Sequence, residues 1–99
     1  MFEGIIISKT MRYLLVLLYI NPGKEYYLRE IARRIKQQPN LVRNNLRRLE
    51  RTGMIKSRRS GISIYYSVNP NHAIYPHIKS IVEIVYVADR RLYANLKDK

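Results

Sequence analysis

The 99-residue chain contains no cysteine and only two histidines. Without cysteine it cannot form disulfides, carry out thiol chemistry or build thiolate metal sites. His72 and His77 stand five positions apart, a spacing that does not place both on one face of a helix. The sequence also shows no Ser/His/Asp set, paired carboxylates or glycine-rich phosphate loop. We therefore expect neither an enzyme nor a bound metal or cofactor.

Long apolar runs are missing too. The run Tyr13–Ile20 has eight residues, whereas a membrane-spanning helix needs about 20. No small-residue cleavage site follows it, so we expect no signal peptide, no membrane association and a cytoplasmic protein. No repeat or linker divides residues 1–99, which indicates a single domain. A chain of this length buries only about 60–65% of its extended surface, so a second subunit would help its thin core.

Acidic residues are few, since seven Asp and Glu stand against nineteen Lys and Arg for a formal net charge of +12. Residues 29–59 contain eleven of the basic residues and two of the acidic ones, so +9 of the charge lies in 31 positions. A single-sign field concentrated on one stretch attracts polyanions and favours nucleic-acid binding. An anionic membrane surface would respond to the same charge.

The spacing of apolar residues predicts helices joined to a hairpin. The expected elements are a helix at 9–20 with Ser8 as its N-cap, a strand stub at 25–27, helices at 28–36 and from Pro39 to Gly53, strands at 54–59 and 62–68, and a long helix at 75–97. In the second strand of the hairpin, Ile62 and Ile64 alternate with polar residues, so we expect both on one apolar face.

The predicted last helix is apolar on more than one side, and its apolar residues step by three or four positions. A helix of this kind is buried on more than one side. One side can pack on the chain's own core, and the other requires a second copy, so we expect a homodimer. The predicted interface residues are Ile78, Ile81, Val82, Val85, Ala88 and Leu92.

The order helix, strand stub, helix, helix, hairpin, helix is that of a winged helix-turn-helix. The segments 27–35 and 40–55, with Tyr65-Tyr66 before Asn69-Pro70, resemble ArsR-type (ArsR/MarR-like) winged-helix transcriptional regulators of bacteria and archaea. The resemblance covers residues 9–80 and implies a mainly α fold with a small β-hairpin wing at 54–68. Lys36 and Gln37 depart from it, because those places usually hold a small residue and an apolar plug. We therefore expect a differently packed turn.

The helix that begins at Pro39 predicts a DNA-binding face. With Val42, Leu46 and Leu49 inward, its opposite side is polar and basic. Residues at the start of such a helix reach base edges in the major groove, and later ones reach phosphates. The candidates are Gln38, Asn40, Leu41, Arg43 and Asn44 for bases, Arg47 and Arg48 for phosphates, and Lys56, Arg58 and Arg59 near the hairpin tip. Arg29, Arg33 and Arg34 either contact the DNA backbone or balance Glu30 and Glu50.

These patterns predict a sequence-specific regulator of transcription, a repressor that binds double-stranded DNA as a homodimer with half-sites about one helical turn apart. Two alternatives remain open. An architectural protein would bind DNA with little regard to sequence, which the net charge fits equally well. The second alternative is a module that binds RNA or a protein through the same scaffold. The sequence indicates neither an operator nor a small-molecule effector.

Overall fold

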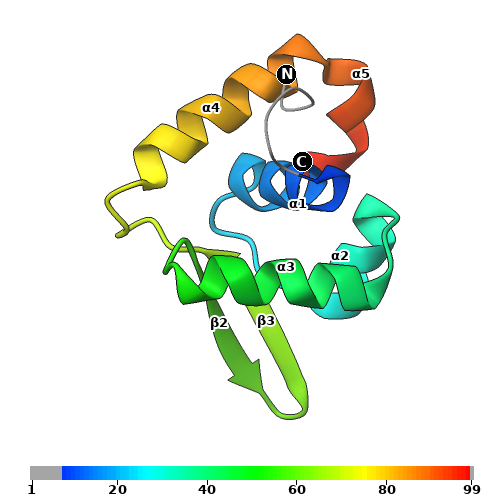
Figure 1. Ribbon diagram of the computed structural model, residues 1–99, viewed down its shortest axis with the longest axis vertical. Coiled ribbons are helices and arrows are strands. Elements are labelled where there is room, and N and C mark those ends of the chain that lie inside the picture. The colour runs from blue at the N-terminus through cyan, green and yellow to red at the C-terminus, as the bar shows by residue number, and fades with distance from the viewer. Residues whose placement is uncertain (1–7, 99) are drawn as a thin grey trace.

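Helices and a small antiparallel sheet build the chain, as a computed structural model that describes residues 8–98 shows (Figure 1). The elements are α1 (Lys9–Ile20), β1 (Tyr26–Tyr27), α2 (Leu28–Ile35), α3 (Pro39–Arg51), β2 (Ile55–Ser60), β3 (Ser63–Val68), α4 (Tyr75–Ala88), α5 (Arg90–Tyr93) and the 3-10 turn η2 (Ala94–Leu96). The strands of these described residues pair in the order β1–β3–β2. The predicted class, mainly helical with a small hairpin, is confirmed.

Helix α1 lies at the centre of the core, between α4 and α3 in Figure 1. Leu14, Val16 and Leu17 are completely buried although they point to different sides of the helix. An all-round apolar helix of this kind is stable only when other elements cover every side. The predicted N-cap is confirmed, since the Ser8 hydroxyl accepts a hydrogen bond of 3.1 Å from the Met11 backbone N–H.

The turn between α2 and α3 contains Lys36 and Gln37, the two residues for which the sequence predicted a differently packed turn. Lys36 ends α2 in the left-handed region, with φ 57° and ψ 48°. Gln37, which takes the place of an apolar plug, accepts a 2.8 Å hydrogen bond from the Thr10 hydroxyl of α1. Pro39 then occupies the first turn of α3, where its missing N–H costs nothing. A polar contact to α1 therefore fixes the junction.

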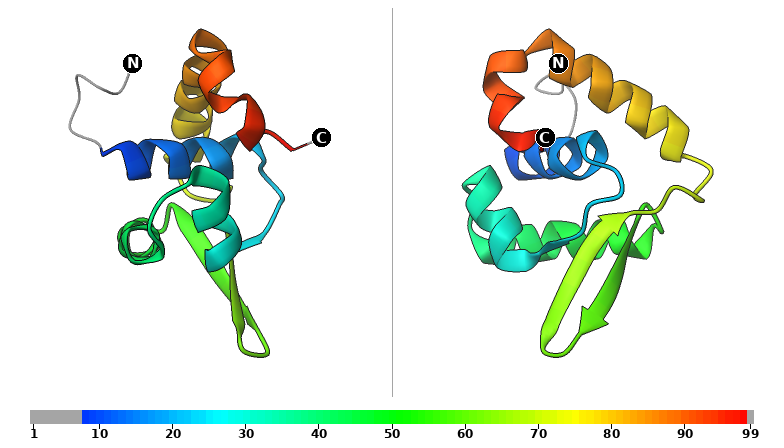
Figure 2. Two further views of the ribbon diagram at one scale, coloured as in Figure 1. Left: turned by 90° about the vertical axis from the view of Figure 1, so that its right-hand side faces the viewer. Right: turned by 180° about the vertical axis from the view of Figure 1, so that it is seen from behind.

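The apolar residues of the β2–β3 hairpin that are fully buried lie at its root. Ile55 and Val68, which face each other across the strands, are 2% and 3% exposed. The hairpin then projects from the helical body (Figure 2). Our expectation for Ile62 is wrong: it lies in the turn beside Gly61, outside the strands, and is 99% exposed. Within residues 8–98, no other element covers its side chain.

The predicted continuous helix at 75–97 is also wrong. Helix α4 ends at Ala88, and Asp89 takes a non-helical conformation with φ −139° and ψ 61°. The chain then reverses, and α5 and η2 return toward α1 (Figure 1). The reversal buries Tyr93 and Leu96, each 2% exposed, in the chain's own core. A straight helix would have carried both side chains away from that core.

A polar network fastens the returning C-terminal segment. The Asn21 side chain donates to the Leu96 carbonyl (2.7 Å) and accepts from the Asp98 backbone N–H (2.7 Å). The Asp98 carboxylate accepts from the Tyr26 hydroxyl and from Arg34 (2.9 Å). Burial alone would raise the pKa of Asp98, but these hydrogen bonds outweigh it and hold the pKa below its usual value. We call this network the C-terminal clamp.

Candidate nucleic-acid interface

Helix α3 is anchored on one side and exposed on the other. Val42, Leu46 and Leu49 are 0%, 0% and 5% exposed, and burying each stabilises the fold by about 1.5–3 kcal/mol. In the left view of Figure 2, α3 is seen end-on at the edge of the molecule. Its predicted DNA-binding residues lie on the opposite, solvent side. Gln38, Asn40, Leu41, Asn44, Arg47 and Arg48 are exposed, and Arg43 is half-buried.

Two polar side chains at the start of α3 hold each other in place. Arg43 donates a 2.9 Å hydrogen bond to the Asn40 side-chain oxygen, one turn earlier. This bond uses one Arg43 donor and the Asn40 oxygen, so the Asn40 amide NH₂ and the other Arg43 donors are not engaged in it. Asn45, in contrast, is 8% exposed and donates to the Leu41 carbonyl (2.8 Å) within the helix. The surface donors are therefore Asn40, Arg43 and Asn44.

The predicted basic residues of the wing divide between its two faces. Successive strand residues point to opposite sides, so Lys56 and Arg58 share one face and Ser57 and Arg59 the other. The Ser57 hydroxyl donates to the Glu50 carboxylate of α3, which identifies the second face as the one beside α3. Arg59 therefore lies on the α3 side of the wing.

Arg58 already has a counter-ion. Its guanidinium makes a two-pronged contact with Glu25, at 2.9 Å from Nε and 2.8 Å from Nη2. The hydrogen bond from Arg58 lowers the pKa of Glu25 and in turn raises that of Arg58. Both side chains are exposed, so solvent screens the pair and its contribution to stability is small. The charge of Arg58 is nevertheless partly offset.

A cleft of about 440 Å³ lies beside the wing and is lined by residues of β1, α2, α3 and β3 and of the hairpin turn. Arg29 of α2 and Arg43 of α3 lie along it, together with Tyr66 and Ile64 of β3. Burial raises the pKa of Tyr66, and nearby Glu50 adds to the shift. The cleft thus combines two cations with an aromatic and aliphatic wall. Sequence spacing did not indicate this grouping, because its members come from several elements.

The arginines of α2 differ in role, which the sequence left open. Arg29 lines the cleft, whereas Arg34 points to the other end of the molecule and forms part of the C-terminal clamp with Asp98. The expected acidic partners have other contacts. Glu30 accepts from the Tyr27 backbone N–H (3.3 Å) and Glu50 from a wing serine. Arg34 therefore balances Asp98 and not the two glutamates.

His72 has a structural position beside the end of α3. Its Nδ1 accepts from the Ile74 N–H (3.1 Å), so Nε2 carries the proton and donates to the Thr52 carbonyl (2.9 Å). The ring also packs against Gly53, where a Cβ would lie 3.1 Å from it. Within residues 8–98, no group of three or more His, Cys, Asp or Glu is placed to hold a metal ion.

Helix α4 has one face toward the core and one toward solvent. Val82 and Val85 are 1% and 2% exposed in the isolated chain, so our prediction that they lie at a dimer interface is wrong. Ile78 is half-buried against the same core. Successive residues of a helix are 100° apart, so α4 presents a second set of apolar residues to solvent. They are Ile81, Ile84, Val87 and Ala88, with Ile74 before the helix and Leu92 after it.

No helix within residues 8–98 has both the length and the apolarity to cross a lipid bilayer. No protein-family model and no curated protein matches the chain.

Solved structures with a similar fold include winged-helix regulators of transcription. The adhesin competence repressor of Streptococcus pyogenes superposes with a TM-score of 0.69 at 14% identity, covering 95% of this chain and 68% of that one. HlyU of Vibrio cholerae superposes with a TM-score of 0.61 at 15% identity, covering 87% of this chain and 81% of that one. ZitR of Lactococcus lactis, a zinc-responsive MarR family member, superposes with a TM-score of 0.66 at 18% identity, covering 95% of this chain and 63% of that one. The chain therefore has the winged-helix fold that the sequence resemblance implied.

Proposed function

We propose that this protein is a sequence-specific regulator of transcription that binds double-stranded DNA as a homodimer. Helix α3 enters the major groove and the β2–β3 wing lies beside it. The observation that carries the proposal is the division of α3 into an anchored aliphatic side and an exposed side of amide and guanidinium groups. Similarity in fold to a named repressor supports the same class of function.

The first two turns of α3 supply the base contacts in this proposal. A major groove about 12 Å wide admits one helix. Asn pairs with adenine and Arg with the acceptors of guanine, so Asn40, Asn44 and Arg43 match the chemistry of base edges. The Asn40–Arg43 hydrogen bond limits the rotamers of both side chains before binding, which lowers the entropy cost of contact. Leu41, 48% exposed, offers an apolar surface to a thymine methyl group.

Cations of α2, α3 and the wing supply the phosphate contacts in this proposal. Arg47 and Arg48 follow the base-contacting turns of α3, and Arg59 extends from the α3 side of the wing. Arg29, which lines the cleft, adds a contact from α2. To bind a phosphate, Arg58 would first have to release Glu25, so we assign it a weaker phosphate contact than the sequence suggested. Lys56 lies on the same face as Arg58.

A second copy would cover the exposed face of α4. Ile84 and Val87 are 56% and 60% exposed, and Ile81 is 39% exposed beside them. Contiguous aliphatic surface of this kind is a common mark of a protein–protein interface. A net charge of +12 makes two free copies repel each other, so an apolar contact and bound DNA would together stabilise the dimer.

Selection of duplexes from a random pool, followed by fluorescence anisotropy on the selected sequence, tests the proposal. We expect an inverted repeat with half-sites about one helical turn apart. In the variant Asn44→Ala, discrimination at one base pair should fall by about 1–3 kcal/mol. Asn95→Ala, a change at an exposed asparagine in η2, serves as the matched control. Equal affinity for selected and random duplexes would favour the architectural alternative instead.

A further inference from the structure

The sheet of the wing has a second face, which is turned away from α3. Ser57 contacts α3, so its strand neighbours Lys56 and Arg58 point to the opposite side. In the sheet register Arg58 pairs with Tyr65, and Tyr65 pairs with Tyr27. Directly opposed residues of neighbouring strands share one side of a sheet. Arg58, Tyr65 and Tyr27 therefore form a row across β2, β3 and β1, on the side that we call the outer face.

The members of this row contact one another and remain accessible. The Tyr27 and Tyr65 rings meet edge to face, with their centroids 6.1 Å apart and their planes at 81°. The Arg58 guanidinium lies 5.2 Å from the centre of the Tyr65 ring. Tyr27 and Arg58 are exposed, and Tyr65 is half-buried. Aromatic rings and guanidinium planes on an open surface are the groups on which proteins stack unpaired nucleic-acid bases.

A hollow of about 320 Å³ adjoins the row at the root of the wing. Glu25 connects the two, since it lines the hollow and accepts both hydrogen bonds from Arg58. Lys56 and its cross-strand partner Ser67 also line the hollow. Its other walls are largely apolar and comprise Pro22, Gly23, Val68, Pro70 and Tyr75. Its volume lies at the lower end of the range of small-ligand sites, about 300–1,000 Å³.

The charges of the outer face favour a polyanion. Arg58 offsets the charge of Glu25, which leaves that of Lys56 in excess. Lys56 is exposed and lines the hollow, so its ammonium group can reach a phosphate beside a bound base. The net charge of +12 on the whole chain adds to this attraction.

We propose that the outer face binds single-stranded DNA. Unpaired bases stack on the row of Tyr27, Tyr65 and Arg58, a neighbouring base occupies the hollow, and Lys56 contacts the phosphate between them. A duplex cannot bind in this way, because its bases stack on one another and present only their edges in the grooves. That the strand is DNA rests on the proposed function of the opposite face, whereas the stacking of unpaired bases does not.

Fluorescence anisotropy of the full chain with a labelled oligothymidylate of about ten nucleotides, a length typical of single-strand sites, tests the proposal. The controls are an abasic strand with the same phosphates and the matching oligouridylate. We expect the oligothymidylate to bind at least about fivefold more tightly than the abasic strand, because each stacked base contributes about that factor or more. Equal affinity for these two strands would overturn the proposal, and tighter binding of the oligouridylate would overturn the choice of DNA.

Matched variants separate the outer face from the α3 side of the wing. Tyr65→Leu removes the ring and keeps an apolar side chain, so it should weaken oligothymidylate binding by about fivefold or more and leave affinity for the selected duplex unchanged. Tyr65→Phe should bind both ligands as the original protein does. Arg59→Met should weaken duplex binding and change oligothymidylate affinity by less than about twofold at about 0.15 M salt. If Tyr65→Leu weakens both ligands alike, or neither, the proposal is overturned.

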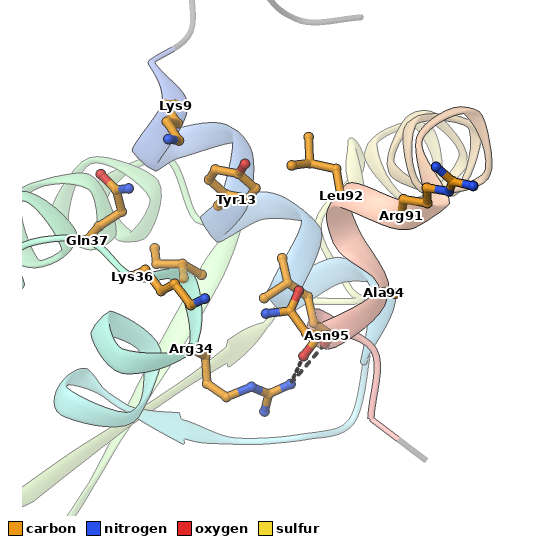
Figure 3. A pocket seen from close by; sticks show the side chains of 11 residues that line it. Lys9, Tyr13, Arg34, Lys36, Gln37, Arg91, Leu92, Ala94 and Asn95 are labelled. Carbon is orange, nitrogen blue, oxygen red and sulfur yellow. Dashed lines mark hydrogen bonds between the residues drawn. The ribbon is translucent and has the colours of Figure 1, made fainter.

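A second pair of variants distinguishes a built site from attraction to net charge. Lys56→Met should weaken oligothymidylate binding by about fivefold or more, whereas Arg91→Met should change it by less than about twofold. Arg91 lies in α5, at the end of the molecule away from the wing (Figure 1), and its guanidinium points away from Lys9 and Lys36 (Figure 3). Equal losses in the two variants would contradict a built site.

Stacking itself can be observed by fluorescence. The chain has no tryptophan, so Tyr65→Trp places a single tryptophan in the row. The oligothymidylate should quench its emission, and the abasic strand should not. A bound oligothymidylate that leaves the emission unchanged would contradict stacking. Failure to bind the selected duplex would refute the proposed function alone and would not alter this quenching.

Discussion

Two neighbouring residues of α4 should respond in opposite ways to the same substitution. Val85 is 2% exposed in the chain's own core, whereas Ile84, about 100° away around the helix, is 56% exposed. An aspartate in place of Val85 would bury a carboxylate with no partner, at a cost of several kcal/mol. A chain of 99 residues has a free energy of unfolding of about 5–15 kcal/mol. Val85→Asp should therefore unfold the protein or leave it barely stable.

Ile84→Asp should leave the monomer folded and abolish the dimer, since the new charge is hydrated in the monomer and desolvated only in the interface. Circular dichroism during heating measures the first effect, and sedimentation velocity at several protein concentrations measures the second. Ile84→Ala is the milder control, and it should weaken the dimer without a change in the unfolding temperature. If Ile84→Asp remains dimeric, or if Val85→Asp unfolds at the temperature of the original protein, the assignment of the two faces is refuted.

Three further changes test other parts of the structure. Asp98→Asn should lower the free energy of unfolding at pH 7 by about 1–2 kcal/mol by weakening its bond to Arg34. The folded pKa of Asp98 lies below the unfolded one, near 3.9. Its contribution is therefore present above that pH and lost as the pH falls toward the folded pKa, and denaturant titrations at pH 3 and 7 should show a smaller difference for the variant. Arg47→Ala should weaken binding to all duplexes alike and reduce the slope of log K against log salt by about 1; an unchanged slope would exclude a phosphate contact. Gly53→Ala should destabilise the chain by about 1 kcal/mol or more in thermal melts, because φ is +80° and its Cβ would meet the His72 ring at 3.1 Å; no loss of stability would show that the ring moves freely.

Local patterns were sufficient for the first two-thirds of the fold. Ser8, Pro39 and Gly53 mark helix ends by their own conformational chemistry, and the elements between them were predicted to within about two residues. The exposed face of α3 followed from the same periodicity, because three aliphatic residues one turn apart leave only one side free. These features depend on neighbours in sequence, which a sequence displays directly.

The rest depends on contacts between distant residues. The apolar periodicity continues past Asp89, but the chain reverses there. The reversal is stabilised because Tyr93 and Leu96 pack on elements far earlier in the chain. The ion pair of Arg58 joins residues 33 positions apart, and that of Arg34 joins residues 64 apart. No local pattern encodes such partners. The same limit applied to α4, where apolar residues on all sides did not reveal which side meets the core.

The central claim is that the polar side of α3 is the surface that meets DNA. Amide chemical shifts of the ¹⁵N-labelled protein, recorded during titration with the selected duplex, test it most directly. We expect the largest shifts at Asn40, Arg43, Asn44 and Arg47, smaller ones in the wing, and little change in α5. Shifts concentrated in α4 and α5, with α3 unaffected, would contradict it.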